Sequence, residues 1–134
     1  MNRTSHIQAR LVQYFDSIAS RWDKWQARNQ YYHKTIEQLL QFLITPNFSV
    51  LELGCATGDL INAVHPSFGV GVDISPAMVQ LAQQKYPHHL FYAMDAEELL
   101  LNRKFDYIVM SDLVGVYIQT KALSIYYGIN SVMA

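Results

Sequence analysis

Two glycines separated by three residues follow an apolar run in the stretch VLELGCATGD at residues 50–59. A strand that enters a glycine-containing turn and then a helix brings backbone N–H groups close to a ligand at the helix N-terminus. Gly54 and Gly58 permit backbone conformations and close approaches that a side chain would block. The stretch favours a nucleotide-like ligand, and its simpler interpretation is a tight turn between a strand and a helix.

Two aspartates follow further apolar runs. FGVGVD ends at Asp73, 21 residues after Glu52, and HLFYAMD ends at Asp95. A carboxylate at the first of these strand ends can accept both hydroxyls of a ribose, and one at the second can accept from the amino group of an adenine. Without a ligand, Asp73 would be a solvated strand end or helix cap, and Asp95 an N-cap. With the glycine turn, the acids predict a ligand that carries an amino acid, a ribose and an adenine.

The glycine spacing argues against one class of ligand. A GxGxxG dinucleotide fingerprint starting at Gly54 would require glycines at 56 and 59, where the chain has Ala56 and Asp59. The shorter pattern GxGxG misses only at Ala56. A nicotinamide-dependent oxidoreductase is therefore the less favoured alternative.

Alternating strands and helices must position these residues. From Phe48 onward, short apolar runs alternate with helical segments, which predicts βαβ units and a parallel sheet. Ser75 followed by Pro76 predicts a helix start. Apolar spacing predicts two earlier helices, over 7–25 and 31–44, and Pro46 ends the second. In that helix, the residues predicted to point inward are Ile36, Leu39, Leu40 and Leu43.

Over residues 49–118, four segments resemble motifs of the class I S-adenosylmethionine-dependent methyltransferases, the Rossmann-like family. They are VLELGCATG, GVDISPAMV, YAMDAEEL and FDYIVMSDLV, and YFDSIASRWD at 14–23 resembles the N-terminal lid helix of small-molecule members. The resemblance implies an α/β fold: a Rossmann-like, mostly parallel sheet of strand order 3-2-1-4, flanked by helices and preceded by two N-terminal helices.

The resemblance also implies S-adenosylmethionine as cofactor and S-adenosylhomocysteine as product. Glu52 would organise the loop and the methionine end, and Asp73 would take the ribose hydroxyls. Ile74 would pack on the adenine, and Asp95 with Ala96 would read its edge. The full set of cofactor-binding residues so implied is Tyr14, Glu52, Gly54, Cys55, Ala56, Gly58, Asp73, Ile74, Asp95, Ala96 and Ser111.

The resemblance also implies roles for residues from two other segments, the lid helix and the end of the fourth strand. Tyr14 would close over the cofactor from the lid helix, and Ser111 with Asp112 would face the cleft near the sulfonium. No catalytic residue is assigned, because a general base is optional in methyl transfer and His33 is more simply a packed or surface histidine. Trp22 and Trp25 are expected to pack, or to wall a substrate pocket.

Full members of the family have seven strands in the order 3-2-1-4-5-7-6, and the segment after the fourth strand here has no candidates for the rest. We therefore expect one shortened domain: a helical lid (1–47), a cofactor-binding core (48–118) and an apolar tail (119–134). The expected function is methyl transfer to a small-molecule acceptor. The alternative is a cofactor-binding fragment of a larger methyltransferase that is inactive alone.

The composition of the chain argues against several kinds of binding partner. The 134 residues carry a net charge of −1 without long runs of one sign, so neither nucleic acid nor an anionic membrane is an expected partner. Cys55 is the only cysteine, which excludes an internal disulfide and fits the cytoplasm; we expect it to be a small apolar filler. No metal site is expected, and His88 and His89 are interpreted as solvated. The exposed edge of the fourth strand and the apolar tail predict a homodimer.

Overall fold

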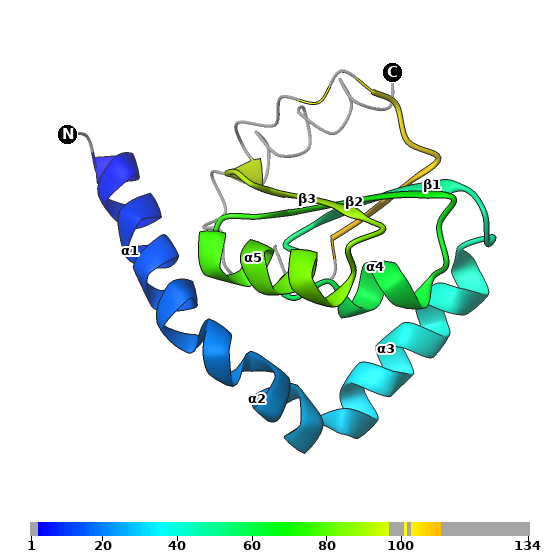
Figure 1. Ribbon diagram of the computed structural model, residues 1–134, viewed down its shortest axis with the longest axis horizontal. Coiled ribbons are helices and arrows are strands. Elements are labelled where there is room, and N and C mark those ends of the chain that lie inside the picture. The colour runs from blue at the N-terminus through cyan, green and yellow to red at the C-terminus, as the bar shows by residue number, and fades with distance from the viewer. Residues whose placement is uncertain (1–2, 97–100, 102, 111–134) are drawn as a thin grey trace.

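A four-stranded parallel sheet forms the centre of the protein (Figure 1). The computed structural model describes residues 3–96, 101 and 103–110. The strands are β1 (Ser49–Leu53), β2 (Phe68–Asp73), β3 (Leu90–Ala93) and β4 (Tyr107–Val109). Their order in the sheet is β3-β2-β1-β4, and every pair is parallel. The predicted fold class and strand order are confirmed.

The register of the strands brings their carboxyl ends to one edge of the sheet. Leu53 of β1 lies opposite Val72 of β2, and Asp73 of β2 lies opposite Ala93 of β3. The turn after β1 and the acid at the end of β2 are therefore neighbours. Ligands of open α/β sheets bind at this edge, outside the carboxyl ends of the strands. We call this side of the sheet the carboxyl edge.

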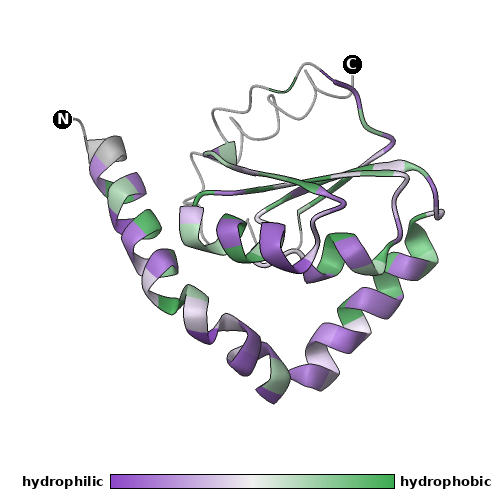
Figure 2. Cartoon of the chain, in the orientation of Figure 1, coloured by the Kyte–Doolittle hydropathy of each residue, from purple (hydrophilic) through white to green (hydrophobic). Residues whose placement is uncertain are grey.

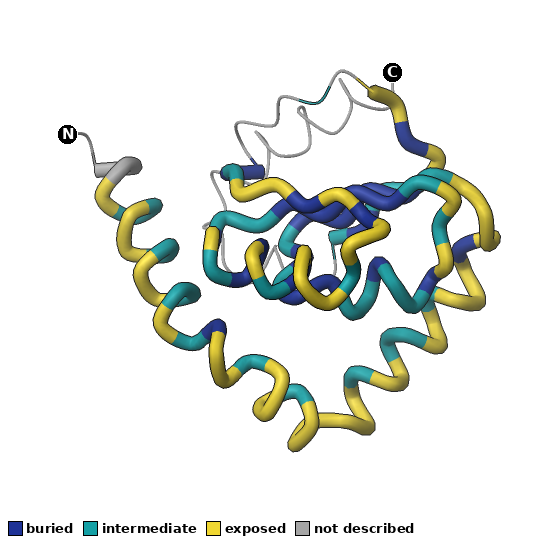
Figure 3. Tube along the Cα trace, in the orientation of Figure 1, coloured by how far each residue is buried: buried dark blue, intermediate teal, exposed yellow. Residues whose placement is uncertain are grey.

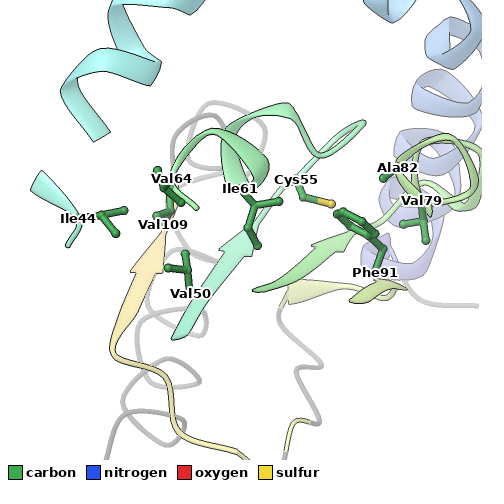
Figure 4. Packing of buried hydrophobic residues seen from close by; sticks show 9 residues of the cluster. All are labelled: Ile44, Val50, Cys55, Ile61, Val64, Val79, Ala82, Phe91 and Val109. Atoms are coloured by element: carbon green, nitrogen blue, oxygen red, sulfur yellow. The ribbon is translucent and has the colours of Figure 1, made fainter. Parts of the chain in front are cut away.

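Apolar side chains pack on both faces of the sheet, whose strands are largely hydrophobic (Figure 2). The two central strands, β1 and β2, are buried along most of their length, whereas β3 is largely exposed (Figure 3). On one face, the ring of Phe91 lies among Cys55, Val79 and Ala82 (Figure 4). The helices on this face are α4 (Asp59–Ala63) and α5 (Pro76–Lys85). The cluster on the other face consists of Leu51, Leu53, Val70, Val72, Ala96 and Phe105.

Helix α5 begins as the sequence predicts. Ser75 is its N-cap, since its Oγ accepts a hydrogen bond of 3.2 Å from the N–H of Met78, and Pro76 occupies the first turn. The proline has no N–H to leave unpaired at that position. This helix start fixes the chain directly after Asp73.

The N-terminal helices form a V around α4 and α5 (Figure 1). The elements are α1 (Arg3–Ile18), the 3₁₀ turn η1 (Ala19–Arg21), α2 (Trp22–Arg28) and α3 (Gln30–Leu43). The first predicted helix is therefore two α-helices joined by a tighter turn, whose Ala19 is buried. We call residues 3–28 the N-terminal arm. Across the described part of the chain, no helix is both long and apolar enough to cross a bilayer.

Candidate functional site

The turn after β1 has an unusual backbone. Gly54, Ala56 and Gly58 all have positive φ angles, of 77°, 47° and 87°. Its start is held by the carbonyl of Val72, which accepts from the N–H groups of Gly54 at 2.7 Å and Cys55 at 3.0 Å. Glycine adopts positive φ without a steric penalty, whereas alanine does so at a cost. The loop therefore keeps the shape of a three-glycine turn although alanine occupies the middle position.

Asp73 holds this loop from the end of β2. Its Oδ2 accepts from the N–H of Ala56 and its Oδ1 from the N–H of Ser75, both at 2.9 Å. Burial raises the pKa of Asp73; the two N–H donors act against the shift, and the charge of Asp16 adds to it. A carboxylate offers about four lone-pair positions, and the N–H groups of Ala56, Ser75 and Ile74 all act on Asp73. Asp73 can thus shape the loop and still accept a further hydrogen bond from a ligand.

Packing explains part of the glycine pattern. A Cβ on Gly58 would lie 2.8 Å from Cζ of Phe91, and one on Gly71 would lie 2.6 Å from Cδ1 of the same ring. Phe91 is itself buried in the core. Gly58 is therefore needed for both its φ angle and the ring beneath it, and the loop sits directly on the core.

Cys55 lies in the same packed layer. The Cβ that would be added to Gly71 would also lie 2.9 Å from Sγ of Cys55. Burial raises the pKa of the Cys55 thiol well above its ordinary value, and the charges of Glu52 and Asp73 add to the effect. A thiol in this state is a poor nucleophile, and the geometry agrees with the predicted filler role. Glu52 is 2% exposed in the centre of the sheet.

Asp95, the acid that follows β3, contacts the N-terminal arm. The side-chain amide of Gln8 donates to Oδ2 of Asp95, which is 9% exposed. Ala96 beside it is buried. The end of β3 is therefore joined to α1, a contact that sequence reasoning did not predict.

Two aspartates of the N-terminal arm, Asp16 and Asp23, also contact the core. Asp16 accepts from Oγ of Ser75 at 2.5 Å and from the N–H of Ala77 at 3.1 Å. Its charge lies at the N-terminus of α5, where the helix dipole favours an anion. Asp23 accepts from Oγ1 of Thr57 at 3.1 Å and pairs with Lys85 at 3.0 Å. Sequence reasoning missed both, because the partners lie in distant segments.

Asp59, in the first turn of α4, completes this polar junction. It pairs with Nζ of Lys85 at 2.7 Å and accepts from the hydroxyl of Tyr86 at 2.6 Å. Burial and the bond to Asp59 raise the pKa of Tyr86. Asp59, where the dinucleotide fingerprint would have its third glycine, therefore fixes α4 to the end of α5.

The remaining predicted residues are more scattered. Tyr14 is 59% exposed on α1 and meets Phe15 edge to face, with ring centroids 5.3 Å apart. Ile74 is half-buried between Asp73 and Ser75. Ser111 lies outside the described residues. The described part of the chain has no group of three metal-ligating side chains.

These features define a class: an open parallel α/β sheet with a glycine turn and two acids at its carboxyl edge, suited to an adenosine-bearing ligand. The sequence matches the methyltransferase domain family over residues 50–132. The chain belongs to this family, and its fold is that of the class I S-adenosylmethionine-dependent methyltransferases.

Solved structures agree with this assignment of the fold. Magnesium protoporphyrin IX methyltransferase from Synechocystis PCC 6803, with bound SAM, gives a TM-score of 0.75 at 21% identity, covering 95% of this chain and 72% of that one. The N-methyltransferase NodS from Bradyrhizobium japonicum WM9, in complex with S-adenosyl-L-homocysteine, gives 0.78 at 19% identity, covering 92% and 67%. At these identities, the similarity concerns the fold.

Curated relatives are longer than this chain. Malonyl-[acyl-carrier protein] O-methyltransferase from Priestia megaterium is 28% identical over 106 residues, which cover 74% of this chain and 39% of the relative. A Methanocaldococcus jannaschii protein is 32% identical over 97 residues, covering 72% and 37%. The chain thus spans less than half the length of these relatives.

Proposed function

We propose that this chain binds S-adenosylmethionine across the carboxyl ends of β1, β2 and β3 and transfers its methyl group to a small-molecule acceptor. The supporting observation is the bond of 2.9 Å between the Ala56 N–H and Oδ2 of Asp73. It joins the positive-φ loop to the acid at the next strand end. Membership of the methyltransferase domain family supports the same cofactor.

The residues that would hold the cofactor are those predicted from the sequence. The loop Gly54–Gly58, with Glu52 beneath it, would contact the methionine end, and Asp73 would accept the ribose hydroxyls. Ile74, Asp95 and Ala96 would surround the adenine. Tyr14 and Ser111 complete the proposed set.

When bound, the cofactor would supply an electrophilic methyl carbon, which would bond to the acceptor's nucleophilic atom as the carbon–sulfur bond breaks and sulfur keeps the electron pair. The contribution of the chain is alignment and exclusion of water. The rigid loop on Phe91 supports alignment, since three hydrogen bonds hold it to β2. No general base is assigned.

A second candidate is a cofactor-binding portion of a larger methyltransferase that is inactive alone. The short span relative to curated relatives favours it.

Within the described sheet, β4 is paired only with β1. Beside it lies a groove of about 320 Å³, lined entirely by apolar side chains and tyrosine: Leu40, Leu43, Ile44, Tyr107, Ile108, Val109 and Met110.

We further propose that a second copy of the chain covers this edge, giving a homodimer in the cytoplasm. Among the described residues, the outer edge of β4 has no strand partner and lies beside an apolar groove, and such an edge favours association. Sedimentation velocity at micromolar concentration tests the dimer. A monomer at every concentration would contradict it without bearing on cofactor binding.

Isothermal titration with S-adenosylhomocysteine tests the cofactor proposal. We expect Asp73→Ala to remove two charge-assisted hydrogen bonds, each contributing about 1.5 to 3 kcal/mol, and so to weaken binding by at least about a hundredfold. Glu37→Gln, on α3, is a matched loss of one negative charge and should leave the affinity unchanged. Equal affinities in the two variants, or tighter binding of NAD, would contradict the proposal.

A further inference from the structure

The N-terminal arm carries two different stripes along its length. One consists of Gln8, Asp16, Asp23 and the buried Ala19, and its polar members bond to the core. The other lines a groove of about 690 Å³ formed by Tyr14, Phe15, Ile18, Arg21, Trp22, Lys24, Trp25 and Arg28. The arm therefore uses its acids to dock on the core and leaves its cations and rings on the groove.

The groove has the size and lining of a small-molecule site. Ligand pockets typically measure about 300 to 1,000 Å³, with apolar walls and a few polar groups. Trp25 is 51% exposed, and its ring centroid lies 5.3 Å from that of Trp22. Large aromatic rings left open on a surface often mark a binding site.

The charged side chains that the structure describes in the groove all have one sign. Arg21, Lys24 and Arg28 are exposed, and no carboxylate occurs among the described lining residues. None of the three cations forms an ion pair with a residue that the structure describes. The nearest acid in sequence, Asp23, is engaged by Thr57 and Lys85. Guanidinium and ammonium groups beside aromatic walls suit an anion attached to a flat or apolar body.

We propose that this groove binds the methyl acceptor, and that the acceptor is an organic anion. Its apolar body would lie against Trp22 and Trp25, and its negative group would meet the three cations. This inference rests on the proposed function. Tyr14 connects the two sites, because it lines the groove and is also predicted to close over the cofactor.

Intrinsic fluorescence provides a direct test, because both tryptophans of the chain line the groove. The probes are 2-naphthoate and its neutral counterpart 2-naphthol, with dodecanoate as an aliphatic anion. We expect 2-naphthoate to bind at least about tenfold more tightly than 2-naphthol. Binding of either anion supports the proposal, and their ratio shows whether the body is aromatic or aliphatic.

Charge removal gives the decisive comparison. Arg21→Gln/Lys24→Gln/Arg28→Gln should weaken 2-naphthoate by about threefold per charge and leave 2-naphthol within about twofold. Arg10→Gln, an exposed cation of α1 outside the groove, is the matched control and should change neither. If the triple variant does not fold by circular dichroism, the three single variants replace it, since each position is on the surface.

Three outcomes overturn the proposal: equal affinities for 2-naphthoate and 2-naphthol, unchanged 2-naphthoate affinity in the charge variants, or groove tryptophans that a second copy of the chain covers. Titration with S-adenosylhomocysteine runs in parallel on every variant and should be unaffected. Failure of the wild-type chain to bind S-adenosylhomocysteine would remove the proposed function, whereas the anion preference of the groove is measured independently.

Discussion

The carboxyl edge of the sheet and the N-terminal arm both depend on aspartates, but their contacts differ in range. Asp73 accepts from N–H groups that lie 2 and 17 residues away in sequence. Asp16 and Asp23 reach partners 59 and 34 residues away. The edge is thus organised by neighbouring chain segments and backbone conformation, whereas the arm is organised by isolated side-chain contacts with the finished core. We therefore expect the carboxyl edge to be rigid, and the N-terminal arm to detach from the core without unfolding the sheet.

Gly58→Ala should have the largest effect, because it disturbs the edge where the loop meets the core. The new Cβ would lie 2.8 Å from the Phe91 ring at a φ of 87°, and we expect a loss of about 2 to 4 kcal/mol in the free energy of unfolding. Urea denaturation measures it. Phe91→Leu in the same chain should relieve the steric part and leave the backbone part, so additive effects of the two changes would contradict this account.

Asp16→Asn should loosen the arm and leave the edge intact. The substitution weakens an anionic cap at the start of α5, which contributes about 1 kcal/mol. Hydrogen exchange should become faster in α1, with little change in β1 and β2. Ser20→Ala, an exposed position of the same arm, is the control. Equal acceleration in the strands would show that arm and edge unfold together.

Two aspartates should give opposite pH slopes of stability. Burial raises the pKa of Asp73, so the folded chain holds more protons than the unfolded chain just above the ordinary aspartate range, and stability falls as pH rises through that window. The N–H and hydroxyl of Ser49 lower the pKa of Asp106, whose contribution is lost as pH falls through its folded-state value. Urea unfolding of the wild type, Asp73→Asn and Asp106→Asn from about pH 3 to pH 7 measures both contributions. The difference in stability between the wild type and each variant should give the slope of the aspartate that was replaced. Slopes of the same sign would contradict the assignment.

Ala56→Gly should have the smallest effect. Glycine relieves the positive φ of 47°, but it also loosens the unfolded chain, and the two effects partly cancel. We expect a change in stability below about 1 kcal/mol and an affinity for S-adenosylhomocysteine within about tenfold, or about 1.4 kcal/mol. A much larger gain in affinity would mean that the natural loop is closed to the ligand, which favours the inactive alternative.

The sequence predicted the parts that depend on local rules. Apolar runs and turn residues predicted the strands, the family resemblance implied their order, and Ser75 with Pro76 predicted the start of α5. The glycine spacing predicted the turn, because glycine adopts positive φ without a steric penalty. The residues at the carboxyl edge follow from strand ends, which hydrophobic runs mark.

Contacts between distant segments could not be predicted in this way. The periodicity of 31–44 predicted α3, but Leu39 and Leu43 are exposed, while Leu40 packs against the core. An apolar stripe shows that a helix is amphipathic, and tertiary packing decides how much of that stripe is covered. The bonds of Gln8, Asp16 and Asp23 have no sequence pattern, because polar residues on a helix usually face solvent.

The long reach of the arm has a consequence for the order in which the chain acquires its structure. Gln8 and Asp95 are 87 residues apart, and Asp16 and Ser75 are 59 apart. Joining such distant points requires a large loss of chain entropy, which is recovered only after the intervening strands are in place. During synthesis, the first helix leaves the ribosome long before its partners exist. We therefore expect the N-terminal arm to dock after the sheet has assembled, because the bonds of Gln8 and Asp16 cannot form before the segments that carry Asp95 and Ser75 are in place.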